Sequence, residues 1–463
     1  LSLYNHLILD NQDRKLIKKI ELKRQEVKLQ IEKEFLAIFL NKTVSNAINK
    51  GNIKHKIKSL NSNYSKINKK LNAFTISVKE KQKALMPNQA QIRYINLTIG
   101  HNKLYQILLT KQKAKINLVN CDVKNYLSNS INKLKLALKK SDIKGFQNHS
   151  YAIYEYLFKG LEEDLDSRIN EIEIIPFGEI SNLPFDLLVK SKVETNDFRK
   201  LDYLIKDYSF NYALSNAVKT INSNQKYAHN VPLSIYKPEV SNDELSKLSY
   251  AENLGKNIAD RYDSKLFLNA NSNIENFKKS LIESKVISVL SHGRSSMFLD
   301  DKYKGIYLSD GFLSMDSIYK LKSKTEFLIL NACNTARGFK DDGEGNINIV
   351  RAFKSIGVKS ILSANWEIDE YSSTSILGAF FENLEHNKPK SVALRNAKLK
   401  FIDSNPPRLA NPLYWSGLNI TGDNDPVELV RNNIFSKTLI YLLIFVGVLC
   451  LVIVLKNLIQ NYS

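Results

Sequence analysis

From about residue 172 onward, short apolar runs alternate with amphipathic helical stretches, and this alternation constrains the fold more than any other feature. Strands that alternate with helices build a mostly parallel sheet, because each strand is followed by a helix that packs on the sheet. The predicted strands are Ile172–Ile175, Tyr203–Phe210, Leu233–Tyr236, Val286–Leu290, Phe327–Leu330 and Val358–Ser363. The predicted helices are Asp243–Tyr262, Ile274–Ile282, Ile347–Ile356, Ser372–Leu384 and Ser391–Ile402. The sequence therefore predicts an α/β fold, a mostly parallel sheet flanked by helices.

Residues 86–170 have a different pattern and are predicted to form a β-hairpin and helices that lead into the α/β domain. The predicted strands are Ile92–Ile99, Leu104–Leu109 and Ile116–Val119, with a turn at Gly100-His101-Asn102, and the predicted helices are Val123–Lys140 and Ile143–Leu165. Residues 1–85 contain no proline between Leu7 and Leu85, and their apolar residues recur at helical spacing. This pattern predicts two long helices that turn back near Gly51. Both a helical repeat remnant and a coiled coil fit it.

The positive charge of the chain is concentrated in its first third. Residues 1–150 hold 30 Lys/Arg and 9 Asp/Glu, whereas the remaining 313 residues hold 37 and 38, and together they give the net charge of +20. A basic arm can bind nucleic acid or an anionic bilayer. The segment lacks the clustered arginines and interleaved aromatic residues typical of nucleic-acid binding. We therefore expect a solvated helical surface that contacts a regulatory protein, and no nucleic-acid partner.

Near the C-terminus, Leu439–Leu455 is a run of seventeen residues without a charged or strongly polar side chain, bounded by Lys437 and Lys456. This run is just long enough to cross a bilayer, because the flanking lysines can extend their ammonium groups to the interface. A buried core helix has a similar lower length limit, but it rarely lacks a polar face. We therefore predict a transmembrane helix at residues 438–457 that anchors a single-pass protein. The flanking basic residues favour a cytosolic location for the bulk of the chain.

Cysteine usage excludes two classes of structure. The three cysteines, Cys121, Cys333 and Cys450, are far apart and odd in number, so they indicate no disulfide framework. No pair of cysteines or histidines has the spacing of a zinc site, so we expect neither a metal nor a cofactor. A reducing compartment fits this usage.

Two predicted strands end in residues that can perform chemistry. His292 and Gly293 follow Val286–Leu290, and Cys333 follows Phe327–Leu330. Ligands of parallel sheets bind beyond the carboxyl ends of the strands, so both reactive side chains emerge at one edge if the strands are neighbours. The imidazole can take the thiol proton, and the thiolate can attack a carbonyl. The backbone N–H groups of Gly293 and Cys333 can then form an oxyanion hole.

Further short motifs accompany these strand ends in a fixed order. They are Ile175-Pro176-Phe177-Gly178, Leu183-Pro184-Phe185-Asp186-Leu187-Leu188, Ser291-His292-Gly293, Asn331-Ala332-Cys333-Asn334-Thr335-Ala336, Gly343-Glu344-Gly345, Arg351-Ala352-Phe353 with Gly357, Ser363-Ala364-Asn365-Trp366 with Asp369, and finally Pro412, Tyr414, Trp415 and Gly422. Taken together, this series resembles the CHAT domain, a caspase-like family related to separases. We assign residues 171–425 to this domain.

The resemblance implies a cysteine endopeptidase that cleaves protein substrates through a thioester on Cys333, with His292 as general base and then acid. Helical repeats of the tetratricopeptide type commonly lie upstream in the family, which agrees with the helical residues 1–85. The alternative is a catalytically silent, membrane-tethered scaffold that uses the caspase-like fold to bind partners.

Three residues are assigned to the substrate groove. Asn331 is the first residue of the cysteine motif, and Trp366 and Asp369 follow the strand Val358–Ser363. Trp366 has two equally acceptable interpretations, since an indole at this edge packs either against a substrate side chain or over the core. Asp369, together with Asp300, is a candidate for selecting a basic residue before the scissile bond.

Overall fold

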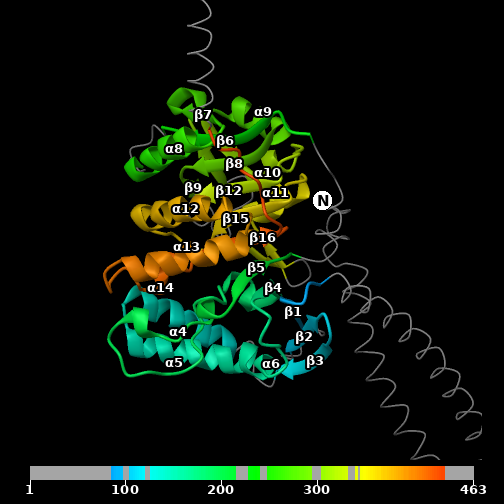
Figure 1. Cartoon of the computed structure of the whole chain (residues 1–463), viewed down its shortest axis with the longest axis vertical. Helices are drawn as coiled ribbons and strands as arrows, with labels where there is room; N and C mark the ends of the chain where they lie inside the picture. Colours follow the sequence, from blue (N-terminus) through cyan, green and yellow to red (C-terminus); the bar gives the residue numbers. More distant parts are fainter. Residues whose placement is uncertain are drawn as a thin grey trace, which may run out of the picture.

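A single mixed sheet forms the centre of the computed structural model, which describes residues 85–96, 104–119, 126–214, 228–239, 248–294, 304–331, 339–341 and 345–432 (Figure 1). Within these residues the sheet has eleven strands, in the order β3-β2-β1-β4-β5-β16-β15-β12-β8-β6-β7. Their bounds are β1 Gln89–Asn96, β2 Leu104–Thr110, β3 Ala114–Val119, β4 Glu171–Ile175, β5 Ser209–Tyr212, β6 Val231–Lys237, β7 Lys265–Leu268, β8 Ser284–Leu290, β12 Phe327–Asn331, β15 Ser360–Ala364 and β16 Leu418–Gly422. Seven of the ten neighbouring pairs run parallel. The predicted mostly parallel sheet is confirmed.

Helices cover both faces of this sheet. One face packs against α8 (Ser249–Arg261), α12 (Glu370–Leu384) and α13 (Lys390–Ser404). Figure 1 shows these helices one below another, from the β7 end of the sheet toward β5. The opposite face packs against α9 (Ile274–Glu283), α10 (Met315–Ile318) and α11 (Ile349–Ser355), whose apolar side chains form a second core. Nearly every side chain of the inner strands is buried, which explains why these strands are continuous apolar runs in the sequence.

Residues 86–170 extend the same sheet. Strand β1 pairs in parallel with β4 and antiparallel with β2, so the sheet is continuous across residue 171. Helices α4 (Ser128–Lys139) and α5 (Ile143–Tyr154) cover this part. The predicted helix Ile143–Leu165 is divided, because α5 passes into a π-helical turn at Glu155–Lys159 and then into the short α6 at Gly160–Glu162.

The predicted strand Tyr203–Phe210 is wrong except for its last two residues. Leu204–Lys206 is a 3-10 turn, and the strand β5 begins at Ser209. The guanidinium group of Arg395 on α13 donates hydrogen bonds to the carbonyl oxygens of Ile205, at 2.6 Å, and Lys206. These carbonyls are therefore satisfied by a side chain distant in the sequence, and the segment does not need a neighbouring strand.

The last described residues lie at the edge of the sheet opposite the carboxyl ends of β8 and β12. Strand β16 runs antiparallel to β15, so the chain leaves the sheet at the edge where β8 and β12 begin. The ammonium group of Lys285, at the start of β8, donates to the Glu428 carbonyl at 3.4 Å. The amide of Asp263 donates to Val430 at 2.8 Å, and that of Asn432 donates to Arg261 at 2.9 Å.

Several predictions concern residues outside those described. They are the helical region 1–85, the turn at residues 100–102 and the transmembrane helix at residues 438–457. In the part of the chain that the structure describes, no helix combines the length and the apolar character needed to cross a membrane.

Candidate active site

The carboxyl ends of β8 and β12 define the site. These strands are parallel neighbours, and their register places Leu290 opposite Asn331. The amide of Ser291 also donates to the Asn331 carbonyl at 3.2 Å. His292 lies two residues beyond Leu290, and in the sequence Cys333 likewise comes two residues after Asn331. Cys333 itself lies outside the described residues, so the structure gives the strand register but not the position of the thiol.

A small three-stranded sheet holds the backbone of His292. It consists of β9 (Gly293–Arg294), β10 (Gly305–Leu308) and β11 (Gly311–Ser314). The amide of Tyr307 donates to the His292 carbonyl at 3.1 Å, and the Ser291 hydroxyl donates to the Tyr307 carbonyl at 2.7 Å. The backbone amide and carbonyl of Tyr307 thus hold His292 and its neighbour Ser291 in place.

Close packing of this small sheet requires a glycine at position 305. A Cβ atom on Gly305 would lie 2.1 Å from the carbonyl oxygen of Leu313, which is far inside van der Waals contact. The glycine therefore lets β10 and β11 approach, and β10 in turn reaches the residues beside His292.

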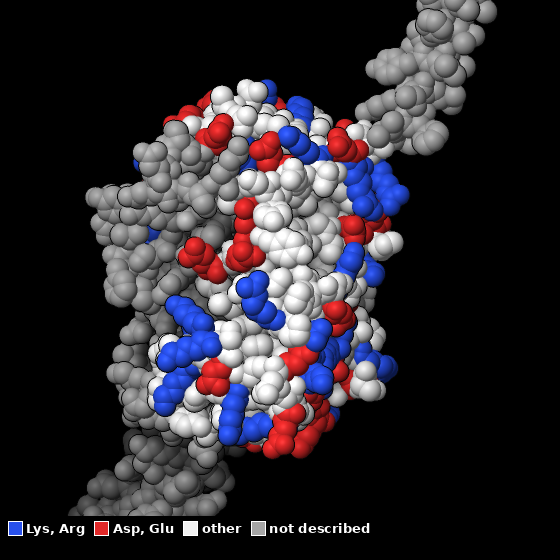
Figure 2. All heavy atoms as spheres, turned by 90° about the vertical axis from the view of Figure 1, so that its left-hand side faces the viewer, with Lys and Arg blue, Asp and Glu red and all other residues white. Residues whose placement is uncertain are grey.

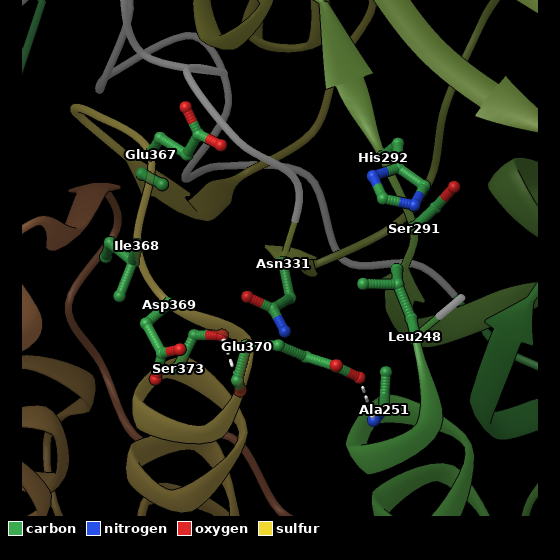
Figure 3. Close-up of a pocket in the computed structure, with 11 residues that line it drawn as sticks. Leu248, Ala251, Ser291, His292, Asn331, Glu367, Ile368, Asp369, Glu370 and Ser373 are labelled. Carbon is green, nitrogen blue, oxygen red and sulfur yellow. Dashed lines mark hydrogen bonds between the residues drawn. The ribbon is translucent and has the colours of Figure 1, made fainter. Parts of the chain in front are cut away.

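A cavity of about 240 Å³ lies beside His292 (Figure 3). Its described lining is drawn from the ends of β8, β12 and β15 and from the first turns of α8 and α12, and consists of Leu248, Ala251, Ser291, His292, Asn331, Ala364, Glu367, Ile368, Asp369, Glu370 and Ser373. Figure 3 shows Asn331 between His292 on one side and Glu367 and Asp369 on the other. The structure therefore brings together His292, Asn331 and Asp369, three of the residues selected from the sequence.

Two of the three carboxylates at this cavity also hold helix ends. Asp369 caps α12, because its Oδ2 accepts hydrogen bonds from the amide and the hydroxyl of Ser372, both at 2.9 Å. Oε1 of Glu370 accepts a hydrogen bond from the amide of Ala251 in the first turn of α8, at 3.0 Å. These bonds tie the starts of the two helices together and fix one wall of the cavity.

Trp366 packs against the core. Its side chain is partly buried against the larger hydrophobic cluster, and its indole nitrogen donates to the Leu413 carbonyl at 2.9 Å. A Cβ atom on Gly417 would lie 2.9 Å from that nitrogen, so the indole fills the space above this glycine. Of the two interpretations of Trp366, these contacts fit the one in which the indole covers the core.

Sequence reasoning missed part of the lining. Glu367 and Glu370 directly follow Trp366 and Asp369, which were selected from the sequence. Nothing in the sequence distinguished these two glutamates from ordinary surface acidic residues. Leu248 and Ala251 come from the start of α8, and only the topology brings this helix beside α12. Asp300, the other acidic candidate, lies outside the described residues.

The fold and the strand-end histidine define a mixed α/β protein of caspase-like architecture. The family model of the CHAT domain matches residues 147–423, and the chain therefore belongs to the CHAT domain family. The match begins within α5, ahead of the boundary at residue 171 assigned from the sequence.

The solved structures that this chain resembles are distant in sequence. A chain of the Saccharomyces cerevisiae separase–securin complex is similar with a TM-score of 0.51 at 13% identity, covering 80% of this chain and 32% of that chain. The complex of Porphyromonas gingivalis RgpB pro- and mature domains gives a TM-score of 0.38 at 10% identity, covering 66% and 76%. This chain thus spans about a third of the length of the yeast chain. No curated protein matches it in sequence.

Proposed function

We propose that the chain is a membrane-anchored cysteine endopeptidase in which His292 and Cys333 form the catalytic dyad. The observation that carries the proposal is the register of β8 and β12, because positions 292 and 333 follow the same pair of opposed residues, Leu290 and Asn331. Neighbouring strands of a sheet lie about 4.8 Å apart, a separation that suits an imidazole and a thiol acting on one carbonyl.

In the proposed reaction, the His292 imidazole takes the proton of the Cys333 thiol, and the thiolate attacks the carbonyl carbon of the scissile peptide bond. The oxyanion is stabilised by the backbone N–H groups of Gly293 and Cys333. The imidazolium then protonates the leaving amine as the C–N bond breaks, which leaves a thioester on Cys333. A water molecule, deprotonated by His292, hydrolyses this thioester and releases the acid product.

We propose that residues 438–457 anchor the protein and that the catalytic edge faces away from the bilayer. The chain leaves the described domain at Asn432, at the edge of the sheet opposite His292. The six Cα–Cα steps from Asn432 to Thr438 span at most about 22 Å. The anchor therefore holds the edge nearest Asn432 close to the membrane. The cavity then faces away from the bilayer, and substrates reach it from the side of the membrane on which most of the chain lies.

Protein substrates fit this arrangement, and the separase–securin complex shows that a chain with a similar fold assembles with another protein. We propose that the basic region 1–85, which the sequence predicts to be helical, contacts a regulatory protein of this kind. Controlled activity would then depend on a partner rather than on a metal or a cofactor.

A comparison of protein N-termini in cells tests the activity. Cells that express the full chain should contain new N-termini that are lost in the Cys333→Ala variant and retained in Cys121→Ala, a matched loss of the other cysteine that precedes the predicted anchor. If Cys333→Ala produced the same new N-termini as the unmodified chain, the peptidase proposal would fail. Partner binding without any new N-termini would instead support the silent scaffold.

A further inference from the structure

Two exposed tyrosines lie at the starts of the helices that form the cavity wall. Tyr250 in the first turn of α8 is 54% exposed, and Tyr371 in the first turn of α12 is 39% exposed. Their rings pack edge to face, with centroids 5.6 Å apart and an angle of 74° between the planes. Tyrosine offers a large apolar ring with a polar hydroxyl, so exposed tyrosines close to a cavity are candidates for contacting a ligand.

This pair is adjacent in sequence to residues that line the cavity beside His292. Tyr250 directly precedes Ala251, and Tyr371 directly follows Glu370, and both of these neighbours line the cavity. The hydrogen bond from the Ala251 amide to Glu370 joins the two helix starts, so the tyrosines are held at a fixed place beside the cavity. The hydroxyl of Tyr371 also donates to Oδ1 of Asn405 at 3.3 Å, which restricts the orientation of its ring.

The charge of the cavity is negative. Glu367, Asp369 and Glu370 contribute carboxylates, and none of the lining residues that the structure describes is a lysine or an arginine. The carboxylates of Asp369 and Glu370 accept hydrogen bonds within the protein, whereas Glu367 is exposed and reaches the cavity from the turn before α12. Figure 2, which looks onto the left-hand side of Figure 1, shows acidic side chains beside an uncharged area, with basic side chains below them.

We infer that the Tyr250–Tyr371 pair is a substrate subsite, and that this surface accepts an extended peptide with two recognised side chains. A basic side chain enters the cavity near Glu367, and an aromatic or large aliphatic side chain two positions away packs on the tyrosines. Side chains two positions apart in an extended chain lie on the same face about 7 Å apart, so neighbouring subsites can bind them together. This inference rests on the proposed function, since it names the substrate class of the same site.

Equilibrium binding to the full-length Cys333→Ala protein tests the inference without cleavage. The probes are fluorescein-labelled nonapeptide pools with arginine at the centre and either phenylalanine or glycine two positions to its N-terminal or C-terminal side. One phenylalanine pool should bind about tenfold more tightly than its glycine counterpart, as measured by fluorescence anisotropy. Replacing the central arginine by glutamate should abolish the binding of that pool.

Variants on the same background assign the effect to residues. Tyr250→Ala and Tyr371→Ala should each remove most of the preference for phenylalanine, and Glu367→Gln should weaken the preference for arginine over glutamate. Tyr126→Ala is the matched control, because Tyr126 is 45% exposed and also packs edge to face, on Tyr156, away from the cavity. It should change neither preference.

Absence of binding by every pool, or equal binding by the phenylalanine and glycine pools, would overturn the inference. So would an equal loss of preference in Tyr126→Ala. The proposed peptidase activity is judged separately by the dependence of cleavage on Cys333, so a dyad-dependent peptidase without this preference remains a distinguishable result.

Discussion

The carboxyl ends of β8 and β12 border a cavity, whereas the carboxyl end of β4 in the same sheet is covered by apolar side chains. At the carboxyl ends of β8 and β12 the chain presents half-buried polar residues, His292 and Asn331, at the wall of a cavity. Beyond β4 it turns at Gly178, where φ is +60°, through a 3-10 helix at Gly178–Asn182. The following motif then fills the space with apolar side chains that are almost completely buried, namely Leu183, Phe185, Leu187 and Leu188.

The acidic residue of the segment after β4 is also buried and forms an ion pair inside the protein. Asp186 is 4% exposed and pairs with Lys398 of α13, which is 2% exposed. Burial raises the pKa of Asp186, and the neighbouring Lys398 opposes that rise. Parallel strands in general end in crevices suited to ligands. The comparison shows that such a crevice becomes a site only where the connecting segments leave it open, so similarly conspicuous motifs can be structural or functional.

The largest expected effect falls on the open end of the sheet. We expect His292→Ala to lower kcat/KM about 10³-fold, because general acid–base catalysis contributes roughly 10²–10⁴-fold. The same variant should slow the alkylation of Cys333 by iodoacetamide, as measured by peptide mass spectrometry. Cys121 provides the internal control, and its alkylation rate should not change. Equal rates for Cys333 in both proteins would show that His292 does not activate this thiol.

Substitutions in the Asp186–Lys398 pair, near the covered end of β4, should change the stability of the protein rather than its catalytic rate. We expect Lys398→Met to lower the free energy of unfolding by about 3–5 kcal/mol, because it leaves the Asp186 carboxylate buried without its partner. The double variant Asp186→Asn, Lys398→Met should recover much of this loss, which urea unfolding would measure. The activity per folded molecule should remain unchanged. A folded, stable Lys398→Met protein that had lost activity would break the contrast between the two ends.

A smaller effect is expected for the residue next to the histidine. Ser291→Ala removes the hydrogen bond to the Tyr307 carbonyl that holds the His292 backbone from one side. We expect kcat to fall about tenfold with little change in KM, equivalent to roughly 1.4 kcal/mol. Ser291→Thr retains the hydroxyl and should restore part of the rate. A loss of rate that matched a loss of folded protein would reduce Ser291 to a purely structural role.

Most strands of the sheet, including the one that His292 follows, could be predicted from the sequence, because buried parallel strands are continuous apolar runs and turns limit them. Strands β7 and β16 were not predicted. The start of β5 could not be predicted, since Arg395 satisfies the Ile205 carbonyl from almost two hundred positions away. The cavity was only partly predictable for the same reason. His292 and Asn331 follow apolar strands directly, but Ala251 reaches the cavity only because α8 packs beside α12.

The smallest expected effect concerns an ion-pair cluster at the edge of the sheet opposite His292. Glu385, at the end of α12, accepts hydrogen bonds from Arg261, from Arg431 near the end of the described chain, and from the hydroxyl of Tyr262 at 2.6 Å. Burial alone would raise the pKa of Glu385, but these hydrogen bonds outweigh it and lower the pKa to about 2. An unfolded glutamate has a pKa of about 4.3.

The sign of the pH dependence follows from this depressed pKa. The contribution of Glu385 to stability is complete above about pH 5 and is lost as the pH falls toward 2, because the folded state then has to take up the proton that the unfolded state already holds. We expect Glu385→Gln to cost about 1 kcal/mol at pH 7, a modest value because both arginines are well exposed, and progressively less below pH 5. Urea unfolding between pH 7 and pH 3 measures this difference. Glu382→Gln is the matched control on the same helix, with a half-exposed carboxylate, and should cost less at every pH. A cost for Glu385→Gln that did not shrink with acidity would mean that the carboxylate contributes through packing rather than charge, and that Arg431 is not held to the domain by this group.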